Sequence, residues 1–106
     1  MKHPLINPKS THYQDGGKPA IQRIEENLSL MECIGFSRGN IIKYQYRAKL
    51  KGQEQQDIEK LESYKAYYSF LLEILIDNKI NKADVHYLTL SQLYKELRID
   101  IDYSID

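Results

Sequence analysis

Polar and charged residues recur at helical spacing in two neighbouring stretches of the chain. They are Asn40, Lys43 and Arg47 in the first stretch and Asp57, Lys60 and Tyr64 in the second. Side chains three, four and seven positions apart share one face of an α-helix. A short connection around residues 51–53 favours an antiparallel helix hairpin, in which Arg47 faces Asp57 across a turn centred near Gly52. The two polar faces are therefore predicted to confront each other as one groove.

This groove holds residue types that bind phosphate. Arg47 can clamp phosphate oxygens through two parallel hydrogen bonds, whereas Lys43 and Lys60 supply mobile point charges. Arg38 lies at the open end of the predicted hairpin and adds a further positive charge. We therefore expect a local anion site, although fifteen Lys and Arg residues balance fifteen Asp and Glu residues in the whole chain.

A helix that begins just after Gly39 would strengthen this anion site. Helix N-termini present free backbone N–H groups and the positive end of the helix dipole, and a glycine lets an anion approach closely. Asn40 is expected to cap this helix or to contact a base or phosphate. Asp57 is expected to orient Arg47, to hold a cation or to accept a sugar hydroxyl. The spacing alone does not choose among these roles.

A purely structural interpretation explains the same residues. Arg47 and Asp57 would then form a surface ion pair worth about 0–1 kcal/mol, while Asn40 caps a helix and Tyr64 packs in the core. His12, beside Tyr13, would be an ordinary loop histidine. Charged stripes usually belong to solvated helix faces, so both interpretations stay open on spacing alone.

Hydrophobic periodicity predicts an all-α fold built on this hairpin, with about four helices. The expected helices cover residues 19–35, a second stretch that begins at 36–40 and ends near 50, residues 54–77, and residues 91–97. Thr89 or Ser91 would cap the last helix, and residues 78–84 form a polar break. The period-two run at residues 98–105 is the one candidate strand, and a lone strand has no ladder unless another chain supplies it.

The chain is expected to form one domain with three parts. Residues 1–19 hold all three prolines and two adjacent glycines, and they are predicted to form an irregular arm. Residues 20–78 would form the helical core, and residues 79–106 a C-terminal helical extension.

Composition argues against several classes of protein. A formal net charge of zero gives no indication of a nucleic-acid or membrane partner. The single cysteine, Cys33, cannot form an internal disulfide or complete a metal motif, so no metal site is predicted. The sequence shows neither a signal-peptide core nor a stretch of roughly 20 apolar residues. We therefore expect a cytoplasmic protein.

The order and spacing of these motifs resemble a small phage and prophage family whose members are described as nucleotide kinases or as domains of unknown function. The matching residues are His12-Tyr13, Gly39-Asn40, Lys43-Tyr44, Arg47, Lys51-Gly52, Asp57, Lys60 and Tyr64. The resemblance covers about residues 11–72. It implies phosphoryl transfer from a nucleoside triphosphate to a (deoxy)nucleoside monophosphate in a homo-oligomer. The chain, like that family, has no Walker phosphate loop.

The resemblance also implies roles for individual residues. Lys43, Arg47 and Lys60 would act in catalysis by stabilising the transferring phosphoryl group, because that reaction depends on positioning and charge neutralisation. The residues implied to bind the nucleotide are His12, Tyr13, Arg38, Gly39, Asn40, Asp57 and Tyr64. Mg²⁺ would arrive with the nucleotide, and the protein would work in the cytoplasm of a phage-infected or lysogenic cell.

Two other functions remain open. The same groove would serve a phage protein that binds or sequesters a nucleotide without turnover. Alternatively, the E-x-x-E pair Glu59 and Glu62, with Glu25 and Glu26 on another helix, would suit an all-α Mg²⁺-dependent nucleotide pyrophosphatase. The chain also departs from the family pattern at Gln22, where an acidic residue is common.

Oligomerisation is a separate expectation from the residues themselves. Nine tyrosines exceed what one small core readily buries. Tyr44, Tyr46, Tyr67 and Tyr68 cannot all face the same side of their helices. Some tyrosines are therefore expected at subunit contacts, where this residue is enriched.

Overall fold

A computed structural model describes residues 1–6, 14, 15, 17–50, 52 and 54–104. Within these residues the elements follow the order β1 (Gln14–Asp15), β2 (Lys18–Pro19), α1 (Ala20–Asn27), α2 (Leu30–Arg47), α3 (Glu54–Asp77), α4 (Lys82–Tyr87) and α5 (Leu90–Leu97). The all-α prediction is confirmed, because β1 and β2 are two-residue pieces of one small antiparallel hairpin.

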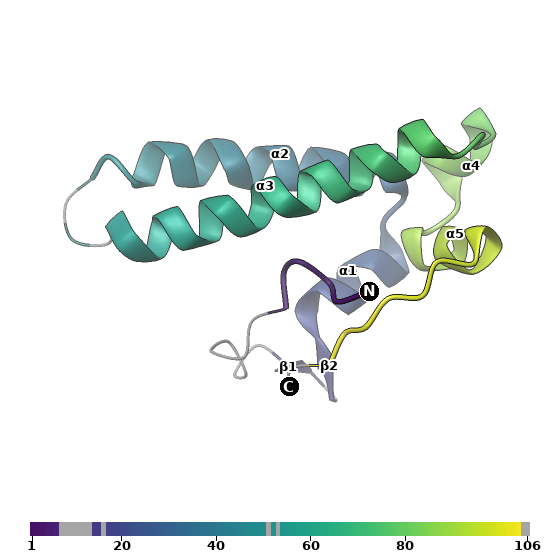
Figure 1. The fold of residues 1–106 in the computed structure, drawn as a ribbon, viewed down its shortest axis with the longest axis horizontal. Coiled ribbons are helices and arrows are strands. Elements are labelled where there is room, and N and C mark those ends of the chain that lie inside the picture. The colour runs from purple at the N-terminus through teal and green to yellow at the C-terminus, as the bar shows by residue number, and fades with distance from the viewer. Residues whose placement is uncertain (7–13, 16, 51, 53, 105–106) are drawn as a thin grey trace.

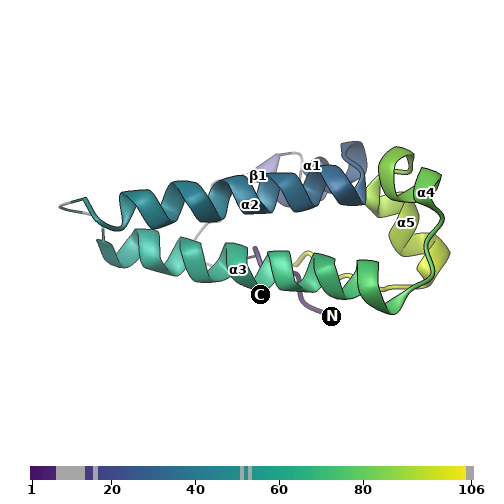
Figure 2. The same ribbon diagram turned by 90° about the horizontal axis from the view of Figure 1, so that it is seen from above.

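The antiparallel pair of long helices α2 and α3 dominates the molecule, which measures 44 × 28 × 20 Å (Figures 1 and 2). The predicted helix hairpin is therefore confirmed, and α3 has the predicted bounds of residues 54 and 77. In both views α1, α4 and α5 gather at the end of the hairpin where α2 begins and α3 ends. The opposite end, which carries the turn between α2 and α3, projects beyond them.

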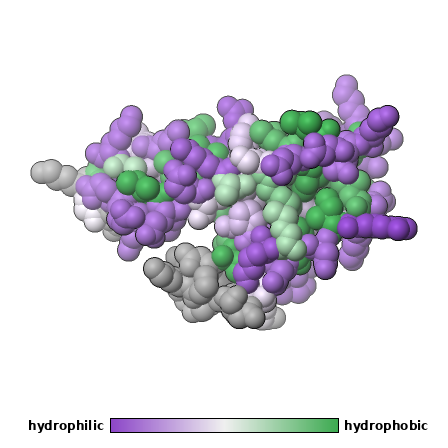
Figure 3. Space-filling model, in the orientation of Figure 1, coloured by the Kyte–Doolittle hydropathy of each residue, from purple (hydrophilic) through white to green (hydrophobic). Residues whose placement is uncertain are grey.

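The hydrophobic core lies where the hairpin meets α1 and α5. Its fully buried members come from three helices and include Leu30, Cys33, Tyr67, Leu71 and Leu90. Hydrophobic side chains gather over this part of the molecule in Figure 3, whereas the projecting end of the hairpin is mainly hydrophilic. The core therefore fixes one end of the hairpin and leaves the other end to be stabilised by contacts between α2 and α3.

The first helix boundary was predicted wrongly. A single helix was expected over residues 19–35 with a stop near Gly35, but the chain breaks at Leu28 and Ser29, and α2 continues through Gly35 to Arg47. Ser29 and Glu32 form a capping box, because the Ser29 hydroxyl accepts from the Glu32 N–H and the Glu32 carboxylate accepts from the Ser29 N–H. A glycine inside a helix costs only about 1 kcal/mol, which the burial of apolar residues of α2 offsets.

Of the two C-terminal helices, the sequence predicted the start of α5 correctly and did not predict α4. The prediction of Thr89 as a cap is confirmed, since Thr89 and Gln92 form a second capping box at the start of α5. The polar break predicted at residues 78–84 instead contains the beginning of α4, whose first turn is capped by Asn81. This six-residue helix is too short to show an amphipathic period, which explains why the sequence did not reveal it.

The two ends of the chain lie side by side and pair with each other. Lys2 and Asp102 form a parallel β-bridge, in which the His3 N–H donates to the Asp102 carbonyl at 3.0 Å and the Asp102 N–H donates to the Met1 carbonyl at 2.7 Å. The candidate strand at residues 98–105 was expected to need another chain, but its described part pairs with the N-terminus of the same chain. None of the helices in the described residues is long and apolar enough to cross a membrane.

Candidate functional site

Three cationic side chains converge on one aromatic ring at the projecting end of the hairpin. The Lys43 Nζ lies 4.5 Å from the centre of the Tyr44 ring, the Arg47 Cζ lies 5.5 Å from it, and the Lys60 Nζ lies 5.6 Å from it. Two of these cations belong to α2 and the third to α3, so the hairpin brings them together. We call Lys43, Arg47 and Lys60, with the Tyr44 ring, the cation cluster.

The ring at the centre of the cluster is itself held by aromatic packing. Tyr44 is buried, and its ring stacks on Tyr64 with centroids 5.8 Å apart and an interplanar angle of 18°. Phe36 meets Tyr64 edge to face at 5.8 Å. Burial and then the neighbouring Tyr44 raise the pKa of the Tyr64 phenol. Tyr64 therefore supports the cluster from within the hairpin, as an uncharged aromatic group.

Asp57 holds Arg47 from the first turn of α3. One Arg47 guanidinium nitrogen lies 3.5 Å from Asp57 Oδ1, which confirms that these two residues face each other. The Asp57 side chain is only 3% exposed, whereas that of Arg47 is 40% exposed. Asp57 Oδ1 is a buried atom without a hydrogen-bond partner, so the guanidinium is the charged group that compensates it. The purely structural interpretation expected an ion pair on the surface, but the Asp57 side of this pair is buried.

Electrostatically, the cluster stands out from a neutral chain. Within the cluster itself, three cations and the single Asp57 carboxylate leave two excess positive charges. Each cation over a ring face gains about 0.5–1 kcal/mol at an exposed site, and this attraction restrains long side chains that would otherwise move freely. The arrangement can bind an anion with several oxygens, because Arg47 offers a fork of donors and the two lysines offer point charges.

The structure separates the other predicted residues from this cluster. Gly39 and Asn40 lie inside α2, so the predicted helix start there is wrong and no free helix N-terminus exists at Gly39. The Asn40 amide donates to the Phe36 carbonyl at 2.9 Å and does not cap a helix. Arg38 is exposed on α2, and no contact within the described residues joins it to the cluster. His12 and Tyr13 lie outside the described residues.

A second polar constellation, which the spacing analysis missed, surrounds Glu25 in the core. Glu25 of α1 is fully buried, and four side chains donate hydrogen bonds to its carboxylate. They are His3 Nε2 at 2.9 Å, the Tyr94 hydroxyl at 3.0 Å, and the hydroxyls of Tyr67 and Tyr103. These donors come from the N-terminus, α5, α3 and the C-terminal segment. Glu25 therefore ties together parts of the chain that are far apart in sequence.

The hydrogen bonds of this constellation have defined directions. The Leu5 N–H donates to His3 Nδ1 at 3.1 Å, so Nδ1 carries a lone pair and the imidazole proton lies on Nε2, facing Glu25. His3 is thus the donor in this hydrogen bond. Burial, and next the charge of Glu25, raise the pKa of the Tyr67, Tyr94 and Tyr103 phenols, which stay protonated as donors. Four side-chain donors therefore surround the buried Glu25 side chain.

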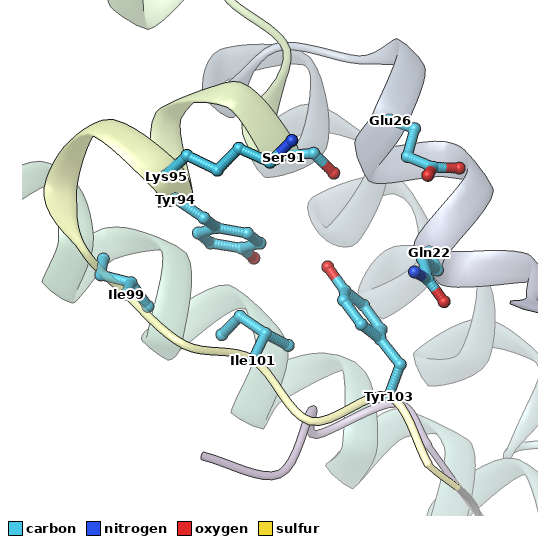
Figure 4. Close-up of a pocket in the computed structure, with 8 residues that line it drawn as sticks. All are labelled: Gln22, Glu26, Ser91, Tyr94, Lys95, Ile99, Ile101 and Tyr103. Atoms are coloured by element: carbon cyan, nitrogen blue, oxygen red, sulfur yellow. The ribbon is translucent and has the colours of Figure 1, made fainter.

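A surface pocket of about 270 Å³ adjoins this constellation (Figure 4). Its lining comes from α1, α5 and the C-terminal segment and consists of Gln22, Glu26, Ser91, Tyr94, Lys95, Ile99, Ile101 and Tyr103. In Figure 4 the hydroxyls of Tyr94 and Tyr103 point toward each other, as expected because both donate to the Glu25 carboxylate. Glu26 is ion-paired with Lys18 at 2.8 Å. Three of the polar residues that line the pocket therefore already have partners within the protein: Tyr94 and Tyr103 bind Glu25, and Glu26 pairs with Lys18.

The acidic residues considered for a Mg²⁺ site are dispersed. Glu25 is saturated by its four donors, and Glu59 and Glu62 lie exposed on α3, where Glu62 pairs with Lys65. Within the described part of the chain, no three His, Cys, Asp or Glu side chains are placed to hold a metal ion. The signal that could have pointed to Glu25 is an acidic residue on the apolar stripe of a helix, because Glu25 lies four positions after Ile21.

Fold and site together define a small all-α protein built on an antiparallel helix hairpin, with a cation cluster on that hairpin and a buried polar hub in the core. The chain belongs to the family described as protein of unknown function (DUF3310), whose model matches residues 7–66 and thus more than half of the chain. That match includes α1, α2 and the first half of α3, and with them every member of the cation cluster. Comparisons with curated proteins and with solved structures gave no match.

Proposed function

We propose that the cation cluster binds the phosphate groups of a nucleotide, and that the protein is a nucleoside monophosphate kinase. The observation that carries this proposal is the convergence of Lys43, Arg47 and Lys60 on the Tyr44 ring. Three cations in one cluster can contact several phosphate oxygens at once, which suits a polyphosphate or a donor and an acceptor phosphate together. The resemblance to nucleotide kinases supports the same assignment.

Phosphoryl transfer suits a site of this composition. An acceptor phosphate oxygen attacks the γ-phosphorus of the donor triphosphate, and the bond from that phosphorus to its bridging oxygen breaks to release a diphosphate. The second pKa of a phosphate monoester is about 6, so the attacking oxygen is largely ionised near neutral pH and needs no general base. What remains is alignment and charge stabilisation, which cations supply.

The residues of the cluster divide this work. Arg47, held by the buried Asp57, presents a preorganised fork to two phosphate oxygens. Lys43 and Lys60 approach the same ring from opposite helices and would neutralise charge on either side of the transferring group. His12 and Tyr13 are proposed to close over the nucleotide, and Mg²⁺ would enter with the triphosphate. Asp57 acts as a positioning residue in this scheme.

Binding without turnover is the second candidate, and one observation favours it. Asp57, the carboxylate of the cluster, is buried and committed to Arg47, so it is not placed to hold a nucleotide-bound Mg²⁺. A protein that only sequesters a nucleotide needs complementary charge and no metal ligand. The pyrophosphatase candidate lacks a comparable observation, because Glu25 lies in the core while Glu59 and Glu62 are on the exposed face of α3.

One assay separates these functions. The purified protein is incubated with single deoxynucleoside monophosphates and a γ-labelled nucleoside triphosphate, with and without Mg²⁺. We expect label to move onto the monophosphate to form a diphosphate. Pyrophosphate released from the triphosphate alone would instead establish the pyrophosphatase, and tight binding with no product would establish sequestration.

We also propose that the protein works in the cytoplasm as a homo-oligomer. The support is the amount of exposed apolar surface on a small chain, for example Ile76 in the last turn of α3 and Leu50 just after α2, which are 76% and 51% exposed. We expect light scattering during size-exclusion chromatography to give a mass that is a multiple of 12.5 kDa. A mass of one chain at micromolar concentration would contradict this expectation.

A further inference from the structure

An exposed aromatic side chain borders the cation cluster on α2. Tyr46 is 69% exposed, and within the described residues its side chain has no ring contact or hydrogen bond. Ile42, four positions earlier and thus one turn away on the same face, is 60% exposed. Large apolar groups gain by leaving water, so this pair offers an unoccupied apolar surface.

Helix geometry places this surface next to Lys43, on the side of α2 opposite Tyr44. Tyr46 follows Lys43 by three positions, and residues at this spacing have Cβ atoms about 5–6 Å apart on a helix. At 100° per residue, the order around α2 runs from Ile42 and Tyr46 through Lys43 and Arg47 to Tyr44. Tyr44 is the buried member that stacks on Tyr64 of α3. Tyr46 and Ile42 therefore lie on the outer side of the cations, away from α3.

We propose that the base of the bound nucleotide stacks on Tyr46, with Ile42 beside it, while the phosphates bind the cation cluster. This inference rests on the proposed function and names a recognition element that the function itself does not require. The occupant is chosen by complementarity, because a nucleotide has an apolar planar base and a charged phosphate chain within one molecule. A second protein chain would gain nothing from an adjacent excess of two positive charges unless it were acidic there.

The chemistry of this platform predicts how the protein selects its substrate. Every base has a π face, so stacking on a tyrosine tolerates all of them and discriminates weakly. The buried polar side chain at the cluster, Asp57, is committed to Arg47, so it is not available to recognise the edge of a base. The protein is therefore expected to accept several bases with similar affinity, in contrast to enzymes with an enclosed base pocket.

The test compares a nucleotide with a ligand that has the phosphates but no base. Affinities of a deoxynucleoside triphosphate and of inorganic triphosphate are measured by calorimetry for the wild-type protein, Tyr46→Ala and Tyr46→Phe. Tyr87→Ala serves as a matched control, because Tyr87 is equally a solvent-exposed tyrosine but lies on α4, away from the cluster. Light scattering on each variant records the oligomeric mass.

We expect Tyr46→Ala to weaken nucleotide binding about 5- to 100-fold, the range that corresponds to losing one base–aromatic stack. Its affinity for inorganic triphosphate should change less than about twofold, and Tyr46→Phe and Tyr87→Ala should bind both ligands as the wild type does. Equal affinities of Tyr46→Ala and wild type for the nucleotide would overturn the stacking role, as would an equal loss for both ligands. A changed mass in Tyr46→Ala would make Tyr46 a subunit contact and also overturn it.

The outcomes for the two proposals remain distinguishable. If the wild type binds inorganic triphosphate and nucleotide equally well, phosphate binding by the cluster stands and only the base platform is lost. If the wild type binds neither ligand, the proposed nucleotide function and the platform are both wrong.

Discussion

Replacing Glu25 with glutamine should lower the free energy of unfolding by about 3–5 kcal/mol, a large part of the 5–15 kcal/mol typical of a small domain. Each charge-assisted hydrogen bond is worth about 1.5–3 kcal/mol, and a buried donor left without an acceptor carries a further penalty. Glutamine has nearly the shape of glutamate, so the effect would report charge and hydrogen bonding, not packing.

The direction of the four hydrogen bonds makes this substitution severe. His3 must donate through Nε2, since its other ring nitrogen already accepts from Leu5. The Tyr103 hydroxyl donates to Oε1, while three donors share Oε2. Whichever oxygen becomes an amide nitrogen, it would point its own N–H groups at a donor. Even where a phenol oxygen accepts from that amide, at least one phenol O–H or the imidazole N–H then loses its acceptor in the core.

The measurement is urea unfolding followed by circular dichroism, with Glu26→Gln as the control. Glu26 is the next residue on α1, but it is partly exposed and ion-paired with Lys18, so Glu26→Gln should unfold at nearly the same urea concentration as the wild type. If both variants unfold at the same urea concentration as the wild type, the carboxylate does not organise the core as described.

Removing single cations from the cluster should abolish or strongly reduce nucleotide binding while the helical content stays unchanged. Lys43→Ala deletes one exposed cation, and we expect about 10- to 100-fold weaker binding of a nucleoside triphosphate, the loss that corresponds to one charge-assisted contact. Arg47→Lys keeps the charge but removes the bidentate fork, so it should weaken binding although the charge of the site is unchanged. Titration calorimetry and far-ultraviolet circular dichroism are the two measurements.

Arg47→Ala requires more caution than Lys43→Ala, because it leaves the buried Asp57 without a charge partner. We expect it to abolish binding and also to lower stability by about 1–3 kcal/mol. Lys82→Ala, an exposed lysine on α4, is the control for loss of one positive charge elsewhere. Normal nucleotide affinity in both Lys43→Ala and Arg47→Ala would eliminate the cation cluster as the binding site.

Local patterns were sufficient to predict the hairpin and part of the site. The helical spacing of apolar residues over 54–77 predicted α3. The short connection between the helices predicted that Arg47 lies opposite Asp57. These inferences succeeded because they depend on interactions between residues that are close in sequence. They correctly predicted that the three cations face one another across the hairpin. They did not predict that the cations converge on the Tyr44 ring.

The remaining features depend on competing or distant interactions. Gly35 resembled a helix end, but tertiary burial on both sides of it and the capping box at Ser29 determined the helix boundary instead. Glu25 could be recognised as an unusual acid on an apolar face, yet its partners come from four separate segments. No periodic pattern specifies which phenol reaches which carboxylate oxygen.

The pairing of the two chain ends has a consequence for the order of folding. The Met1 ammonium donates to the Asp100 carbonyl, a contact between residues 99 positions apart. Closing so large a loop costs conformational entropy before the contact contributes anything, whereas α2 and α3 meet through a turn of a few residues. Contacts between neighbouring segments form fastest, so the α2–α3 hairpin should assemble early and the chain ends should join last. Mutations at His3 or Tyr103 are then expected to accelerate unfolding and to leave the folding rate nearly unchanged.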